Sequence, residues 1–153
     1  MTQETQTSTE APTVVRIVQV DVYAYREGDD ILFSHAWRRQ GDPNRRKGKI
    51  VIPHGEGDVP IHFHLHDRSQ LNLSFLANPA DAMWVDLNDC PTGAGNGNQI
   101  NFVHSSPNLL RVEDDNSDPP CTLHFALRFA GDPTPSGGPP YEYDPEIRNG
   151  GGG

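Results

Sequence analysis

The stretch Cys-Thr-Leu-His-Phe-Ala-Leu-Arg-Phe, residues 121–129, alternates apolar and polar side chains more regularly than any other part of the chain. Leu or Phe occupies every odd position from 123 to 129, whereas the even positions include Thr122, His124 and Arg128. Successive side chains of a β-strand point to opposite faces of a sheet, so this period of two predicts a strand with one buried and one solvated face. The stretch therefore favours an all-β fold.

The same period of two recurs along the chain, and further strands are expected at residues 14–26, 31–37, 49–53, 61–66, 71–76, 82–87, 99–104 and 109–113. Turn-forming residues predict one hairpin between the first two of these strands and another between 61–66 and 71–76. No segment has a sustained helical period, and many of the 15 glycines and 14 prolines fall between the expected strands. We therefore expect a single-domain antiparallel β-sandwich of about eight or nine short strands with flexible termini.

The apolar residues predict one folded domain, at residues 14–130, between two polar ends. Residues 1–13 are rich in Thr, Gln and Glu and are expected to form a disordered tail. Residues 131–153 are rich in Pro and Gly, and their segment 141–147, which contains two tyrosines and an isoleucine, is expected to dock on the domain. Cys90 and Cys121 form no CxxC pattern, so free thiols are expected.

The net charge of −9 bears on the possible partners. A nucleic-acid-binding surface has to be cationic to displace counterions from phosphates, and anionic membranes attract basic segments, so this charge argues against both partners. No apolar run approaches the roughly 20 residues of a membrane span. Residues 1–13 lack the basic and apolar regions of a signal peptide. The sequence thus predicts a cytoplasmic protein.

Three histidines, His62, His64 and His66, alternate with Ile, Phe and Leu in residues 61–66 and so share one face of the expected strand. Neutral imidazoles two residues apart can chelate a divalent metal such as zinc, and His124 is a candidate fourth ligand if its strand is a neighbour. A His-x-His pair on a strand with a distant third histidine resembles the zinc site of the alpha-type carbonic anhydrases. The alternative is that the histidines are ordinary residues of a solvated strand face.

Six of the 12 basic residues lie in one segment, 38–49, whose centre is expected to be an exposed loop: Arg38, Arg39, Arg45, Arg46, Lys47 and Lys49. An acidic counterpart lies in the segment 113–118: Glu113, Asp114, Asp115 and Asp118. A basic loop on one copy that meets an acidic loop on the next would give a head-to-tail contact, and an acidic protein or a small anion would also fit the basic loop. The alternative is a solvated charged loop that keeps strand edges apart.

Sequence motifs of hydrolases and nucleotide-binding proteins, Gly-x-Ser-x-Gly, Walker A and His-Glu-x-x-His, are absent. The sequence therefore favours a non-catalytic binding or self-assembly module with no cofactor, whose partner is another protein or a second copy of the chain. Two alternatives stay open. One is a zinc-dependent enzyme or metal-binding protein that uses the four histidines, and the other is a sandwich that binds a small anion at the basic segment.

Overall fold

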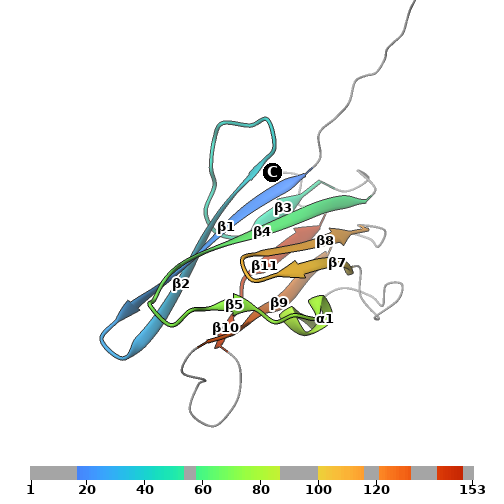
Figure 1. Ribbon diagram of the computed structural model, residues 1–153. Helices are drawn as coiled ribbons and strands as arrows, with labels where there is room; N and C mark the ends of the chain where they lie inside the picture. The colour runs from blue at the N-terminus through green and yellow to red at the C-terminus, as the bar shows by residue number, and fades with distance from the viewer. Residues whose placement is uncertain (1–16, 54–57, 87–99, 116–120, 132–140, 150–153) are drawn as a thin grey trace, which may run out of the picture.

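The computed structural model describes residues 17–53, 58–86, 100–115, 121–131 and 141–149, which form two β-sheets (Figure 1). The all-β sandwich is thus confirmed, and each expected strand overlaps one of the strands β1 to β9. The elements are β1 (Val18–Glu27), β2 (Asp30–Arg39), β3 (Ile50–Ile52), β4 (Val59–Arg68), β5 (Ser74–Phe75), α1 (Pro79–Ala82), β6 (Met83–Asp86), β7 (Ile100–Ser106), β8 (Leu109–Asp114), β9 (Cys121–Ala130), β10 (Tyr141–Tyr143) and β11 (Glu146–Asn149). In the described ranges, no helix has the length and hydropathy needed to cross a bilayer.

The first sheet, called sheet A, has the strand order β2-β1-β4-β8-β7. The expected hairpin of β1 and β2 is confirmed, with an unbroken antiparallel register from Val18 opposite Arg39 to Glu27 opposite Asp30. β4 pairs with the other side of β1 in parallel, and β8 and β7 follow as antiparallel neighbours. The parallel pair could not be predicted from alternation, because parallel and antiparallel strands share the period of two.

The second sheet, called sheet B, is built around β9. On one side of β9, β10 and β11 follow the same antiparallel register, with Tyr141 opposite Phe129 and Ile147 opposite Leu123. On its other side lie β5 and β6, which are separated in the chain by α1. β11 also pairs in parallel with β3. Residues 141–149 therefore form part of a sheet.

The expected hairpin between residues 61–66 and 71–76 is wrong, because β4 lies in sheet A and β5 in sheet B. Asp67 makes the corner between the sheets: its carboxylate accepts hydrogen bonds from the backbone N–H of Ser69 at 2.9 Å and of Leu73 at 2.8 Å. Gln70 and Asn72 adopt left-handed backbone conformations, with φ of 66° and 51°. These side-chain and backbone features turn the chain from one sheet to the other.

The core lies between the inner faces of the two sheets. Alternate side chains of β1 and β4 from sheet A meet those of β9 from sheet B, and Phe63 and Phe129 are among the largest fully buried side chains. The rings of Phe63 and Phe125 lie 5.7 Å apart across this interface, and those of Phe33 and Phe129 lie 5.3 Å apart. Burying a side chain of this size stabilises the fold by about 1.5–3 kcal/mol. On β1 and β4, the side chains that alternate with the buried ones lie on the opposite, outer face of sheet A, and most of them are polar.

Candidate functional site

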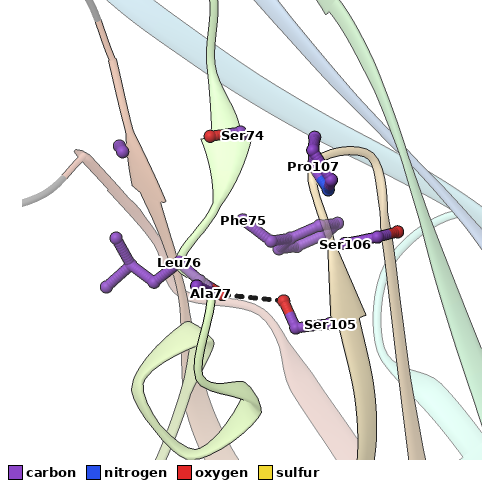
Figure 2. A pocket seen from close by; sticks show the side chains of 8 residues that line it. Ser74, Phe75, Leu76, Ala77, Ser105, Ser106 and Pro107 are labelled. Atoms are coloured by element: carbon purple, nitrogen blue, oxygen red, sulfur yellow. Dashed lines mark hydrogen bonds between the residues drawn. The ribbon is translucent and has the colours of Figure 1, made fainter.

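A cavity of about 320 Å³ lies where β5 of sheet B meets the end of β7 in sheet A (Figure 2). Its lining residues are Ser74, Phe75, Leu76, Ala77, Ser105, Ser106, Pro107 and Ala130. The Ser105 hydroxyl donates a hydrogen bond to the Leu76 carbonyl at 2.7 Å, and the Ser106 hydroxyl donates to the Leu109 carbonyl at 3.3 Å. Since no titratable side chain lines this cavity and two of its hydroxyls are engaged, it offers no group for acid–base chemistry.

The outer face of sheet A carries the histidines predicted from the sequence. His62 and His64 are half-buried and His66 is exposed, and all three alternate with buried side chains along β4. The neighbouring positions on β1 are Gln19, Asp21 and Tyr23, which lie directly opposite these histidines in the parallel register. The fold therefore brings a carboxylate, an amide and a phenol next to the row of His62, His64 and His66, which we call the histidine row.

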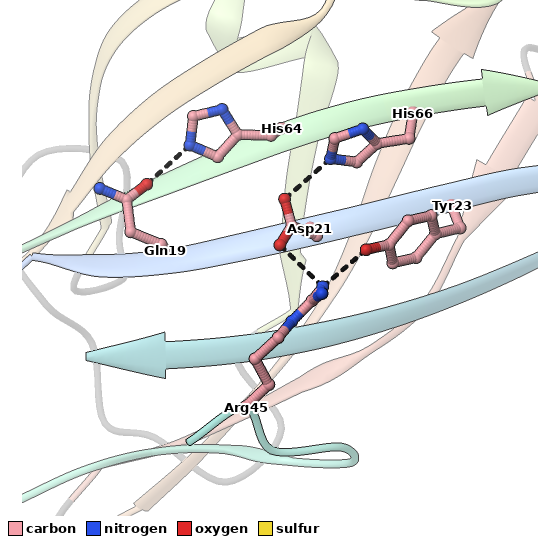
Figure 3. A network of polar contacts seen from close by, with 6 residues as sticks. All are labelled: Gln19, Asp21, Tyr23, Arg45, His64 and His66. Carbon is pink, nitrogen blue, oxygen red and sulfur yellow. Dashed lines mark hydrogen bonds and ion pairs between the residues drawn. The ribbon is translucent and has the colours of Figure 1, made fainter. Parts of the chain in front are cut away.

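Each of two histidines donates a hydrogen bond to β1 (Figure 3). Nε2 of His64 lies 2.6 Å from Oε1 of Gln19, and Nε2 of His66 lies 2.8 Å from Oδ1 of Asp21. An amide oxygen and a carboxylate can only accept, so both Nε2 atoms carry a proton. The ring of His66 also stacks on that of Tyr23, with centroids 5.0 Å apart.

Arg45 of the basic segment extends across the edge strand β2 to the same face (Figure 3). Its Nη2 donates to Oδ2 of Asp21 at 2.8 Å and to the Tyr23 hydroxyl at 2.6 Å. Asp21 thus binds His66 with one oxygen and Arg45 with the other. The hydrogen bond to Tyr23 raises the pKa of Arg45, with a smaller contribution from Asp21. The basic segment is in this way fixed to the histidine row.

Arg46 holds the same segment against the edge of sheet A. Its backbone forms a bridge with Trp37 of β2, and its guanidinium lies 5.5 Å from the centroid of the Trp37 ring, within the range of a cation–π contact. Arg46 also forms an ion pair with Asp42 at 3.6 Å. Arg39 and Lys49, near the two ends of the segment, interact with other residues as well.

Four cations on the outer face of sheet A and in the basic segment make no ion pair in the part of the chain that the structure describes: Arg38, Lys47, Arg68 and Arg111. Arg38 lies opposite Gln19 and Arg111 lies opposite His62, so one row of residues crosses four strands with an arginine at each end. Strands are spaced about 4.8 Å apart, which puts the two arginine backbones about 14 Å from each other.

The pKa values of two histidines reflect this environment. Burial lowers the pKa of His62, and the charges of Arg111 and His64 lower it further. Burial also lowers the pKa of His64, where the carboxylate of Asp21 acts in the opposite direction and Arg38 adds to the lowering. Both imidazoles are therefore neutral at pH 7, and they become charged only in more acidic solution.

The four histidines proposed as metal ligands do not come together. His124 lies on β9 in sheet B, whereas the other three lie on β4 in sheet A. Within the described ranges, no group of three or more His, Cys, Asp or Glu side chains is placed to hold a metal ion. His64 and His66 direct Nε2 toward different residues of β1. The described geometry thus gives the zinc hypothesis no site.

The acidic segment is only partly an exposed loop. Glu113 and Asp114 belong to β8, and Asp114 is fully buried at a core-facing position opposite Val59 and Ile100. Asp115 is half-buried and interacts with another residue, while Asp118 lies outside the described residues. Cys90, for which a free thiol is expected, also lies outside them. Asp114 therefore cannot face a partner.

Sequence reasoning missed Gln19, Asp21, Tyr23 and Arg111 as members of this surface. The alternation of residues 14–26 does put the first three on the polar face of their strand. The alternation does not identify which strand lies beside this one, because β1 and β4 are separated in sequence and pair in parallel. No protein-family model matches the chain, and no curated protein matches it in sequence.

Proposed function

We propose that this protein is a non-catalytic binding module whose outer face of sheet A, joined by the basic segment, recognises an acidic protein partner. The observation that carries the proposal is the row in which Arg38, His62 and Arg111 lie across neighbouring strands, with both arginines lacking an ion pair in the described part of the chain. The whole chain has a net charge of −9, yet these cationic side chains gather on one face. Such a charge distribution favours a complex with a defined orientation.

The contacts of Arg45 support a prearranged surface. Because Asp21 and Tyr23 hold its guanidinium, the basic segment needs little ordering when a partner binds. The non-catalytic part of the proposal is supported by the cavity at β5, which none of the histidines lines.

The lowered pKa values of His62 and His64 add a pH dependence to this proposal. A carboxylate of the partner beside either imidazole favours its charged form, so binding takes up protons. Affinity for an acidic partner should therefore increase as the pH falls from about 7.5 to 5.5.

The test uses a synthetic 20-residue glutamate peptide and isothermal titration calorimetry at low salt. We expect binding that weakens with added salt, and a double substitution Arg38→Ala with Arg111→Ala should weaken it by up to about 25-fold, on the basis of at most about 1 kcal/mol for each lost cation. The matched control is Arg128→Ala, which removes a cation from sheet B, where Arg128 pairs with Glu142 at 3.2 Å.

Two results would contradict the proposal. One is a double variant that binds the peptide as tightly as the wild-type protein does. The other is a wild-type protein that binds a single-stranded DNA 20-mer and not the glutamate peptide, which would identify a different class of partner. Competition by inorganic phosphate at low millimolar concentration would instead favour the small-anion alternative.

A further inference from the structure

In the described part of the chain, β2 leaves one edge of sheet A open. It pairs with β1 along its whole length, and on its other side, within the described residues, it has the single bridge between Trp37 and Arg46. Both hydrogen bonds of that bridge are short, with N···O distances of 2.8 and 2.7 Å. Since Trp37 directs its N–H and C=O outward, residues of the same parity do so too, namely Ile31, Phe33 and His35. The edge from 30 to 36 is thus a template for another strand.

The other sheet edges in the described part of the chain are protected. β7 is irregular between Phe102 and His104, and the exposed Val103 lies at that irregularity. β3 and β10 have only three residues each, and α1 separates β5 from β6. β2, in contrast, has no proline, glycine or charged residue between Asp30 and Arg38. Natural proteins rarely leave a regular, uncharged edge of this length without a partner.

The two ends of the β1–β2 hairpin carry opposite charges. The hairpin tip holds three exposed acidic residues, Glu27, Asp29 and Asp30. The opposite end holds the exposed cations of the basic segment, Arg45, Arg46 and Lys47. Figure 1 shows the tip and the loop of the basic segment at opposite ends of the hairpin. A ten-residue strand is about 33 Å long, so the two charged ends are well separated.

We propose that a second copy of this chain binds to the edge of β2, antiparallel and symmetric about Phe33, so that the two sheets A become one continuous sheet. In this register Asp30 lies opposite Ala36 of the partner subunit. Asp29 then lies next to Arg46 of the partner subunit, which pairs with the β2 edge of its own subunit at Trp37. Each acidic tip meets the basic segment of the other copy, which is the self-complementary arrangement that a two-fold interface requires. The inference goes beyond the proposed function, because it uses the edge of sheet A rather than its outer face.

The first test is an exchange of charges, read by sedimentation velocity on the full chain. One variant carries Asp29→Lys and Asp30→Lys, and the other carries Arg46→Glu and Lys47→Glu. In either variant alone, like charges meet twice in the symmetric dimer, so the dissociation constant should rise by at least about 100-fold. An equimolar mixture should restore the dimer, because the lysine tip meets the glutamate segment and the other contact is native. The control, Asp81→Lys with Asp144→Lys, changes the same charge elsewhere and should dimerise normally.

The second test is amide hydrogen exchange of the wild-type protein, measured by NMR at low and high concentration. The amides of Ile31, Phe33 and His35 should exchange more slowly at high concentration, because only they point to the new interface. The amides of Leu32 and Ser34, which face β1, serve as the internal control and should not change.

Three results would overturn the proposed dimer: a wild-type protein that stays monomeric up to about 1 mM, variants that associate as the wild type does, or a mixture that does not restore association. Arg38 and Arg111 are unchanged in both variants. A monomer that binds the glutamate peptide would therefore contradict the dimer and leave the proposed function standing.

Discussion

Substitution of Ile147 by alanine tests whether residues 141–149 belong to the folded core. Ile147 is fully buried, and its strand pairs with Leu123 on one side and Ile50 on the other. A cavity between two paired strands cannot collapse easily, so we expect a loss of about 3–4 kcal/mol, within the range of about 2–5 kcal/mol for buried Ile-to-Ala changes. That is a large part of the roughly 5–15 kcal/mol that stabilises a typical domain. For a chain of this length the melting temperature should fall by about 6–16 °C.

The loss is measured by urea unfolding, followed by tryptophan fluorescence and circular dichroism. The matched control is Asp144→Ala, an exposed position in the same segment, which should change the free energy of unfolding by less than about 0.5 kcal/mol. If Ile147→Ala costs less than about 1 kcal/mol, the placement of β11 between β9 and β3 is wrong. In that case a chain that ends at residue 130 should unfold at the same urea concentration as the full chain.

Three further predictions concern polar residues. Burial lowers the pKa of His62 and His64 in the folded state, so the unfolded chain binds more protons below pH 6.5. The free energy of unfolding should therefore fall as the pH drops from about 6.5 through the lowered values. Urea unfolding should show a smaller fall after both histidines are replaced by glutamine, and an equal fall would contradict the assignment. A double-mutant cycle with Asp21→Asn and Arg45→Ala should give a coupling of less than about 1 kcal/mol, because Arg45 is 47% exposed; a larger value would mean that the pair is shielded from water. Asp67→Ala should cost about 1–3 kcal/mol in urea unfolding, because the N–H groups at the corner lose their acceptor; a neutral effect would show that the corner does not depend on this carboxylate.

The strands and their buried faces could be predicted from the sequence because alternation is a local property. Residues 121–129 coincide with nearly all of β9, and Leu123, Phe125, Leu127 and Phe129 all face the core. The hairpin of β1 and β2 was also predictable, because its turn at residues 28–29 is of the two-residue type that commonly joins antiparallel strands.

Pairings between distant strands could not be predicted from the sequence, and the candidate site depends on them. The histidine row gained Asp21 as a partner only through the parallel pairing of β1 with β4. The corner at Asp67 failed as a prediction for a related reason. Its polar residues indicate a turn of the chain, but they do not say whether the next strand returns to the same sheet or crosses to the other.

The position of β11 also determines when the fold can be completed. It is the last of the described strands to be synthesised, yet it lies between β9 and β3. During synthesis, β3 therefore waits for its neighbour while all the intervening strands emerge, and one edge of β9 stays open from the time β9 emerges until β10 and β11 follow. Exposed edges of this kind are where nascent chains aggregate, and pairing of distant strands is slow. The yield of folded protein should therefore depend on how β9 is protected before residue 149 leaves the ribosome.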